Sequence, residues 1–571
     1  MYRHSSAGFV YQRLAGSAGR AQVALALGAL LLGAAPRAAL AQDAPAGEAS
    51  PEAEGPAASP SADPSEEGWG PGPQVGDETE EGMYLSKPPA TVAEEDRPTA
   101  RPFIKGELTR VGASKLVAAN NRLGVRMGYE YLDVTHYGLL IPEFDLKIGD
   151  LRVGLGVPLR LEIFGPEGFA NAGALRAEDY DQPSELAKVI RYLSYGRKED
   201  FFFLQISQLD AATIGHGPLM RRYFANADVD ARRVGVQLDA YNDYGGFELH
   251  LNDVIAPFVL GAGAPEGAHL GAVIGGLVFV KPVSWFSDTV LAKSVSLGFS
   301  WAGEVNAPLR LAPPDTIGRI VTDAQHVPVY EGGLVDLMGV DFELKVVKTD
   351  AVDIKPFVDF SVLREPFSAG RGGWGATLGA LGRFNFVGSA APDATVHALR
   401  AIAELRVHAG NYLPGYFDTF YETQKYAYAL AEDGRWRTKY EALQARDPEA
   451  IEVGGYFELS YAPVGALALG AALELSTAPG GNNLYLHAEL PVLSWIQLFA
   501  TVHKRGFTWD QLDLGAPDTI FVSGGRLQLL PILWVNAEAY QVFNFDDAPT
   551  RKVFDRTFGV NLDVELGWEF Y

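Results

Sequence analysis

The end of the chain alternates strictly between apolar and polar side chains. From Phe558 to Phe570 every second residue is apolar, and small or charged residues such as Asp563 and Glu565 stand between them. Successive side chains of a β-strand point to opposite faces, so this pattern predicts a strand with one apolar and one polar face. In a soluble sandwich the apolar face would meet a core. In a membrane barrel it would meet lipid, and the polar face would meet a wet lumen.

The same period of two recurs throughout the region after residue 100. Many of the predicted strands are roughly ten to fourteen residues long, enough to cross a bilayer when tilted, whereas soluble strands cluster at about five to six. We therefore predict an all-β protein, a transmembrane antiparallel β-barrel of 18 strands within a range of 16 to 20. The predicted strands cover 123–131, 151–163, 200–209, 231–241, 244–252, 270–281, 292–304, 338–346, 351–364, 371–386, 395–409, 452–462, 464–476, 483–493, 495–504, 517–529, 532–544 and 558–570.

The connections between the predicted strands alternate in length. Segments 505–516 and 410–451 are long, whereas 530–531 and 494 are tight. One face of long loops and one face of tight turns is typical of outer-membrane barrels. The alternation fails near the start, where 164–199 is long on the side that should carry short turns. The sequence therefore leaves either two or four strands before residue 200.

The first 101 residues predict two segments that precede the barrel. Residues 1–41 read as a cleaved secretory signal peptide, with a basic start, an apolar run over 22–35 and an A-x-A site before Gln42. The apolar run is too short to span ~30 Å of hydrocarbon as a helix. Residues 42–101 are rich in Pro, Ala and Glu and hold few large apolar groups, so we expect a disordered acidic linker. A binding arm for a basic periplasmic partner is the alternative.

This organisation resembles bacterial outer-membrane β-barrels of the porin-like class over roughly residues 101–571, with the barrel domain at 102–571. The resemblance implies the outer membrane of a Gram-negative cell, with membrane lipid and lipopolysaccharide as surroundings. Members of the class tend to end in an aromatic residue that the barrel-assembly machinery recognises. Trp568, Phe570 and Tyr571 are therefore candidates for an insertion signal, although Tyr571 lies one residue past the lipid-facing phase. Many such barrels are homo-oligomers, which stays a hypothesis here.

Composition excludes several classes of function. The chain contains no cysteine, so disulfides, thiolate metal sites and a thiol nucleophile are absent. The formal net charge is −24, and nucleic acid as a partner would need a basic stripe. No nucleophile elbow, H-E-x-x-H motif, P-loop or calcium loop is present, and the ten His lack ligand spacing. We expect no enzyme, no cofactor and no metal site; a hydrolase with an unfamiliar site is the alternative.

The polar faces of the predicted strands collect charges of both signs. We expect such a lining to make a wet, selective channel, because rings of charge decide which solutes enter. The alternative is that the charges pair across strands and leave the lumen closed. The function predicted is passive diffusion of small hydrophilic solutes, and the alternative is a closed barrel whose long loops bind a surface ligand or a partner protein. The candidate lumen residues are Arg126, Glu130, Arg152, Arg160, Glu162, Asp341, Glu343, Lys345, Asp359, Asp563 and Glu565.

Three further segments carry candidate chemistry. Helical spacing predicts an insert near 182–196, and the aromatic-rich segment 411–444 is predicted to be partly helical. We expect each to narrow the mouth of the barrel or to cap its rim. The aromatic residues of the second insert would stack on sugar rings or pack together. In the loop after residue 207, His216, Arg221 and Arg222 are candidates for binding an anionic solute or lipopolysaccharide phosphate, but the favoured interpretation is a surface turn with incidental charges.

Overall fold

The structure is a computed structural model that describes residues 121–570 apart from short gaps. The predicted signal peptide, the predicted linker and Tyr571 lie outside the described residues, so the statements about them stay predictions. The gaps are 133, 181–182, 197–200, 210–211, 229–231, 262–270, 288, 316–319, 323–327, 350, 365–371, 389–390, 464–467, 479, 494–495, 509–517, 531 and 546–553.

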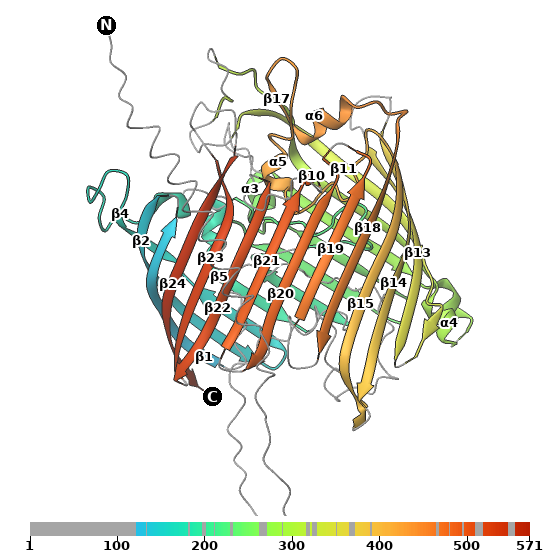
Figure 1. Ribbon diagram of the computed structural model, residues 1–571, viewed down its shortest axis with the longest axis horizontal. Coiled ribbons are helices and arrows are strands. Elements are labelled where there is room, and N and C mark those ends of the chain that lie inside the picture. Colours follow the sequence, from blue (N-terminus) through green and yellow to red (C-terminus); the bar gives the residue numbers. More distant parts are fainter. Residues whose placement is uncertain are drawn as a thin grey trace, which may run out of the picture. The chain divides into compact units, whose positions relative to one another are not determined.

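The described residues form one large antiparallel sheet that closes on itself (Figure 1). Strand β1 (Asn121–Leu132) pairs with β2 (Thr135–Ile148) on one side and with β24 (Phe554–Phe570) on the other. The remaining strands are β3 (Leu151–Gly156), β4 (Leu159–Phe164), β5 (Ile190–Tyr195), β6 (Phe202–Ser207), β7 (Gly235–Tyr241), β8 (Gly245–Leu251), β9 (Ala272–Val280), β10 (Ser296–Leu311), β11 (Tyr330–Glu343), β12 (Val347–Lys348), β13 (Val352–Arg364), β14 (Trp374–Gly388), β15 (Ala391–Ala409), β18 (Ile451–Pro463), β19 (Ala468–Ser476), β20 (Asn483–Leu493), β21 (Ile496–Arg505), β22 (Thr519–Leu530) and β23 (Leu533–Phe545).

The barrel has 20 strands, so the predicted number of 18 is wrong. Strands β3 and β4 both pair with β2, and β11 and β12 both pair with β13, so each couple counts as one interrupted strand. The two strands that the pattern did not reveal are β2, which contains Pro142, and β5, which is only six residues long. With both in place, the long segment 164–199 divides into a long loop before β5 and a shorter connection after it.

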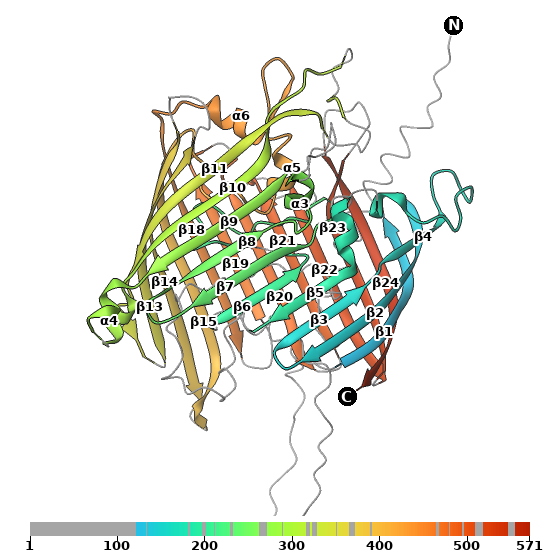
Figure 2. The ribbon, with the colours of Figure 1, turned by 180° about the vertical axis from the view of Figure 1, so that it is seen from behind.

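The two ends of the barrel differ in their connections (Figures 1 and 2). We call the end at which β24 finishes the turn end and the opposite one the loop end. The connections at the loop end include 208–234 and 410–450, whereas β22 and β23 are joined at the turn end by two residues. The connection between β9 and β10 is an exception, because it carries η5 (Pro282–Trp285) and α4 (Val290–Ser294) at the turn end.

The strands keep the alternation of faces that the sequence predicts. On β24 the side chain of Leu562 is 52% exposed, whereas its neighbour Asp563 is 1% exposed. Trp568 and Phe570 lie on the same outer face as Leu562. An apolar outer face and a closed hydrogen-bond ladder are what hydrocarbon requires, because lipid cannot satisfy a free backbone group. Among the described residues, no helix is both long and apolar enough to span a membrane.

The predicted helical inserts contain less helix than expected. Within 182–196, a 3₁₀ helix, η4, covers Pro183–Val189, and β5 covers Ile190–Tyr195. The helical spacing there is misleading, because Tyr192 and Ser194 alternate inward as in any other barrel strand. Within 411–444 the structure has two short helices, α5 (Tyr421–Gln424) and α6 (Lys439–Gln444), and a two-stranded ribbon of β16 (Ala429–Leu430) and β17 (Trp436–Arg437).

Candidate functional site

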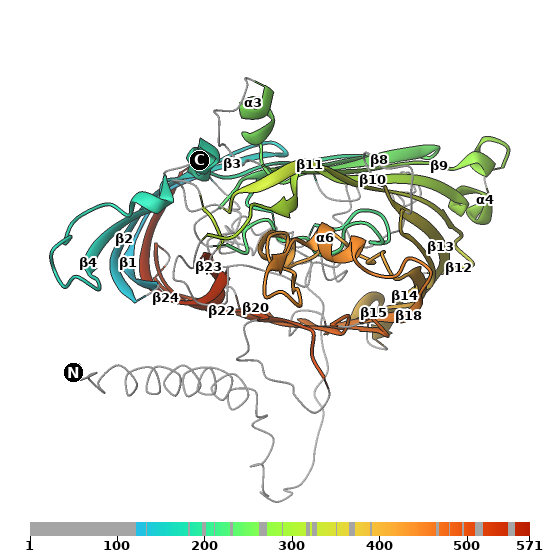
Figure 3. The ribbon, with the colours of Figure 1, turned by 90° about the horizontal axis from the view of Figure 1, so that it is seen from above.

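Two loops from the loop end fold together inside the barrel. They are the β6–β7 loop (208–234) and the β15–β18 loop (410–450), and we call their described residues the plug. Backbone hydrogen bonds join them: the amide of Gly415 donates to the carbonyl of Pro218 at 2.8 Å, and the amide of Arg221 donates to that of Phe417 at 3.0 Å. Seen from above, α6 lies across the opening of the ring of strands (Figure 3), and Figure 1 places it at the loop end. Met220 and Phe417 are 0% exposed and pack against inward side chains of the wall, so the plug occupies part of the barrel interior.

One side of the plug is bound to the wall by apolar contact. Ile214, Leu219, Met220 and Phe417 are each at most 2% exposed and pack against inward side chains of β7, β9, β10, β11 and β13. A Cβ at Gly275 of β9 would overlap the end of the Ile214 side chain, so the glycine leaves the space that Ile214 fills. A smaller cluster unites Phe224 and Phe420 of the plug with Phe499, Ile520 and Val522 of β21 and β22.

Another side of the plug is bound to the wall by ion pairs. Arg221 donates to Glu404 of β15 at 2.6 Å, and its guanidinium lies 4.0 Å from the ring centre of Tyr456 on β18. Arg222 pairs with Glu458 of β18, which also pairs with Arg400 of β15. Every partner is nearly or fully buried. Buried charges are tolerated only when paired in this way, since desolvation is costly.

The two loops of the plug share buried charges of their own. Glu422 accepts a hydrogen bond from Arg233 at 3.0 Å and forms an ion pair with Lys425 at 2.9 Å. Burial alone would raise the pKa of Glu422, but Lys425 and Arg233 together lower it to about 2. Lys425 also reaches Glu304 of β10 at 2.7 Å, so this cluster connects both loops to the wall. Burial lowers the pKa of Lys439 to about 8, with Asp418 opposing the shift.

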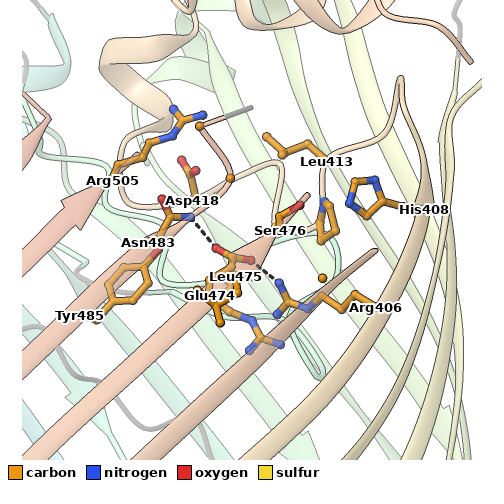
Figure 4. Close-up of a pocket in the computed structure, with 16 residues that line it drawn as sticks. Arg406, His408, Leu413, Asp418, Glu474, Leu475, Ser476, Asn483, Tyr485 and Arg505 are labelled. Atoms are coloured by element: carbon orange, nitrogen blue, oxygen red, sulfur yellow. Dashed lines mark hydrogen bonds and ion pairs between the residues drawn. The ribbon is translucent and has the colours of Figure 1, made fainter. Parts of the chain in front are cut away.

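A pocket lies between the plug and the wall on the side of the ion pairs (Figure 4). Arg221, Leu413 and Asp418 line it from the plug, and the ends of β15 and of β18 to β21 line it from the wall. Glu474 stands at its centre and accepts hydrogen bonds from Arg406 and Asn483. The wall residues are Arg406, His408, Gly454, Glu474, Leu475, Ser476, Asn483, Tyr485 and Arg505, with Gly480 and Gly481 from the β19–β20 connection. The pocket is therefore polar and carries charges of both signs.

The predicted lumen residues all belong to inward faces of the barrel. Nine of them are between 1% and 9% exposed, and Arg152 and Glu162 are half-buried. Many are engaged in ion pairs: Arg160 meets Glu130 at 2.6 Å, and Arg126 meets Asp563. Glu565 pairs with Arg122, and Lys345 with Asp353 at 2.9 Å. Side chains that we expected around open water are thus largely covered and paired, although their role in solute passage stays a prediction.

The loop candidates lie inside the barrel and not on its outer surface. His216 is 3% exposed, Arg222 is 2% exposed, and the Arg221 side chain is 11% exposed. The favoured interpretation of this loop, a surface turn, is therefore wrong for all three. The apolar residues around them, such as Ile214, Leu219 and Tyr223, are the signal that could have shown a buried loop. In the second insert, Tyr412, Tyr416, Phe417 and Tyr421 pack together and are at most 1% exposed, which is the packing alternative for those aromatic residues.

Neither a family model nor a curated protein matches the sequence. Solved structures do match at low identity. OccK11 (OpdR) of Pseudomonas aeruginosa is 12% identical, with a TM-score of 0.29, over 79% of this chain and 96% of that chain. OmpT, an outer membrane protein of Vibrio cholerae, is 11% identical, with a TM-score of 0.26, over 79% and 97%.

Wzi of Escherichia coli is described as an outer membrane protein involved in group 1 capsule assembly and as a carbohydrate-binding β-barrel. It is 12% identical, with a TM-score of 0.29, over 79% of this chain and 85% of that one. Likenesses of this size carry no argument. The closed barrel of 20 strands with its apolar outer face is the fold of a transmembrane β-barrel.

Proposed function

We propose that this barrel is a channel through which small hydrophilic solutes diffuse passively past the plug. The observation that supports this most directly is the polar pocket between the plug and the wall, whose residue Arg221 also belongs to the ion pairs below it. Ion pairs can exchange partners with water and with solutes, whereas apolar contact excludes both. The path would therefore follow the ionic side of the plug, and the plug would be the constriction.

The mechanism requires only diffusion in a field of fixed charges. Arg406, Glu474 and Arg505 line the pocket, and Arg222, Glu458 and Arg400 follow on the wall and the plug. Charges in a narrow passage between low-dielectric walls act strongly on a solute, so they would select by charge as well as by size. We propose transport and no enzymatic role, because these ionisable groups connect the plug and the wall. Export through a cleaved signal peptide belongs to the same proposal.

A closed barrel is the second candidate, and one observation favours it. The inward side chains are buried to a degree that a wide open lumen would not produce, as with Asp563 and Arg126 at 1% and 3% exposed. In that case the long loops at the loop end would bind a surface ligand or a partner protein, and no solute would cross.

Single-channel conductance of the refolded protein in a planar bilayer separates the two candidates. The chain has no cysteine, so an introduced thiol is unique. We expect stable current steps from the wild type, and a reduced step when Ser476→Cys in the pocket is labelled with a bulky thiol reagent. Leu459→Cys, whose side chain is 50% exposed on the outer face, is the matched control and should not respond. A folded barrel without current steps would favour the closed form. Steps that labelling at Ser476→Cys leaves unchanged would place the path elsewhere.

A further inference from the structure

His216 of the plug lies between carboxylates of two wall strands. Its Nδ1 is 3.1 Å from Oδ1 of Asp359 on β13, and its Nε2 is 3.1 Å from Oε2 of Glu343 on β11. The imidazole stacks on Phe357 with the ring centres 3.9 Å apart, which holds the ring plane. The β6–β7 loop thus carries a histidine deep into the barrel and presents both of its nitrogens to acids.

This arrangement is unfavourable for a neutral imidazole alone. A neutral ring has one N–H, and its other nitrogen is an acceptor that repels a carboxylate oxygen. The geometry is favourable when the ring is doubly protonated, or when a cation lies at one nitrogen and the other nitrogen donates its N–H to a carboxylate. The second arrangement is the usual one for a metal-bound histidine, in which an outer carboxylate orients the ring.

Three further observations favour a cation. Asp341 of β11 stands directly opposite Asp359 in the register of the sheet, and like charges in that position are destabilising. One oxygen from each of these aspartates and one ring nitrogen of His216 lie within 4.8 Å of one another. Asp359 is 3% exposed, and its Oδ2 has no hydrogen-bond partner among the described residues. Burying a carboxylate oxygen in this way is costly unless something positive meets it.

We propose that His216, Asp341 and Asp359 bind one divalent transition-metal cation, with Glu343 holding the His216 ring. Two ligand atoms that are each about 2.1 Å from one ion lie about 3–4 Å apart, so small side-chain rotations bring the three donors to bonding distance. The Asp341 carboxylate lies over Gly298, which stands opposite it on β10 and has no side chain to exclude it. One imidazole with two carboxylates suits zinc, iron, cobalt or manganese, whereas magnesium and calcium prefer oxygen donors alone.

The donors come from three separate segments, which explains why spacing along the chain did not reveal them. His216 is 143 residues from Asp359, and it belongs to the plug, whereas both aspartates belong to the wall. A bound ion would therefore fasten the β6–β7 loop to β11 and β13. The site does not depend on whether the barrel conducts.

Calorimetric titration of the refolded full-length chain with Zn²⁺ tests the site. We expect one Zn²⁺ per chain at this site, and no comparable heat with Mg²⁺. His216→Gln and Asp359→Asn should each weaken the tight binding step by about 10- to 100-fold or more, the loss that even outer-ligand mutations cause. His487→Gln is the matched control, because His487 is also buried, at 5% exposed, and faces inward on β20. It should leave the affinity unchanged.

The visible absorption spectrum of Co²⁺ bound to the wild type reports on the metal ligands without any substitution. The proposal therefore stays testable even where a variant fails to fold. Co²⁺ at this site should show d–d bands that Zn²⁺ displaces in a one-to-one ratio. The proposal is overturned if the wild type binds neither ion tightly. It is also overturned if His216→Gln and Asp359→Asn bind Zn²⁺ as tightly as His487→Gln, since the binding would then belong to other carboxylates of this acidic chain.

Discussion

The plug meets two sides of the barrel wall with opposite chemistry. Toward β9 and β10 it presents Ile214, Met220 and Phe417 to apolar side chains, although Lys425 also pairs there with Glu304. Toward β15 and β18 it presents Arg221 and Arg222 to glutamates. Apolar burial is non-directional and gains from every removed Å² of surface. Buried ion pairs gain little net stability, because desolvation cancels most of the attraction. The apolar side should therefore keep the plug in place, and the ionic side should be the one that yields to water and solutes.

The chemical difference between the apolar and the ionic side of the plug also explains where the pocket lies. It opens beside Arg221 and Glu474, on the ionic side, and its lining is polar. Apolar surfaces close on each other and leave no room, since interiors pack to crystal-like density. Charged side chains keep their geometry through hydrogen bonds and leave spaces that water can enter. Four experiments, in order of decreasing expected effect, test this difference between the two sides of the plug.

Removing the apolar anchor should have the largest effect. Ile214→Ala deletes a side chain that fills the space over Gly275, and truncation of a buried isoleucine costs about 2–5 kcal/mol. The plug should then detach more often, so trypsin should cleave after Arg221 or Arg222 faster by about two orders of magnitude. Ile274→Ala, on the outer face of the same β9 strand, is the matched control and should leave the plug protected. Equal cleavage in both variants would mean that the apolar side does not hold the plug.

Acid should loosen the contact between the two loops of the plug. The pKa of Glu422 in the folded protein is about 2, below its usual value, so its stabilisation is complete above about pH 4.5 and is lost as the pH falls toward 2. A shift of this size corresponds to about 3 kcal/mol as an upper limit. Protection from an acid-active protease such as pepsin should therefore fall between pH 4.5 and 2.

Glu422→Gln separates this residue from the other carboxylates of the barrel. The variant should be less protected than the wild type at pH 7, and it should lose less protection on acidification. If the two proteins show the same pH profile, Glu422 does not determine the acid response.

Weakening the ionic side should change the passage of ions through the barrel more than the attachment of the plug to the wall. Arg222→Ala removes the hydrogen bonds to Glu458 and Tyr456. A hydrogen bond that involves a charged group contributes about 1.5–3 kcal/mol to stability. Glu458 keeps Arg400 as a partner, so the loss should be smaller than for Ile214→Ala. In a planar bilayer we expect larger or noisier current steps, while trypsin protection of the bond after Arg221, which the variant keeps, changes little. Unchanged current steps together with lost trypsin protection would mean that the ionic side holds the plug and does not control passage.

Salt should have the smallest effect. Raising the ionic strength from about 0.1 M to about 1 M shortens the screening length from about 10 Å to about 3 Å, but buried pairs are screened much less than exposed ones. Protection of the wild-type plug should change by less than about fivefold, since less than about 1 kcal/mol of stability is at stake. In Ile214→Ala, which depends on the ionic side, protection should be more salt-sensitive. Equal salt dependence in both proteins would contradict the comparison.

Sequence patterning could locate the strands that obey it and could not locate those that do not. The sixteen strands after residue 200 were predicted because apolar and polar residues alternate along them in phase with the barrel wall. Strand β5 was hidden because Leu186, Val189, Ile190 and Leu193 also fit a helical period, and six residues are too few to separate the two periods. The segment is a strand because it forms ladder hydrogen bonds with β3 and β6.

Some features of the candidate site also follow from the sequence pattern, and others depend on the tertiary structure. That Arg126, Asp341, Asp359 and Asp563 face inward follows from alternation alone. That His216 approaches Asp359 across 143 residues, and that Arg222 approaches Glu458 across 236, depends on how the two loops fold into the barrel. Loops lack periodicity, so the sequence showed their charges without showing their partners. The buried apolar residues beside those charges were the available clue.

The membrane β-barrel follows from the sequence, because lipid requires one apolar face on every strand and apolar residues recur at every second position of the predicted strands. That the interior is occupied, which charges are paired and which side of the plug is apolar became visible in the folded molecule. A strand's facing is a local property with a period of two, whereas the contacts of a loop are chosen by the whole surface that it meets.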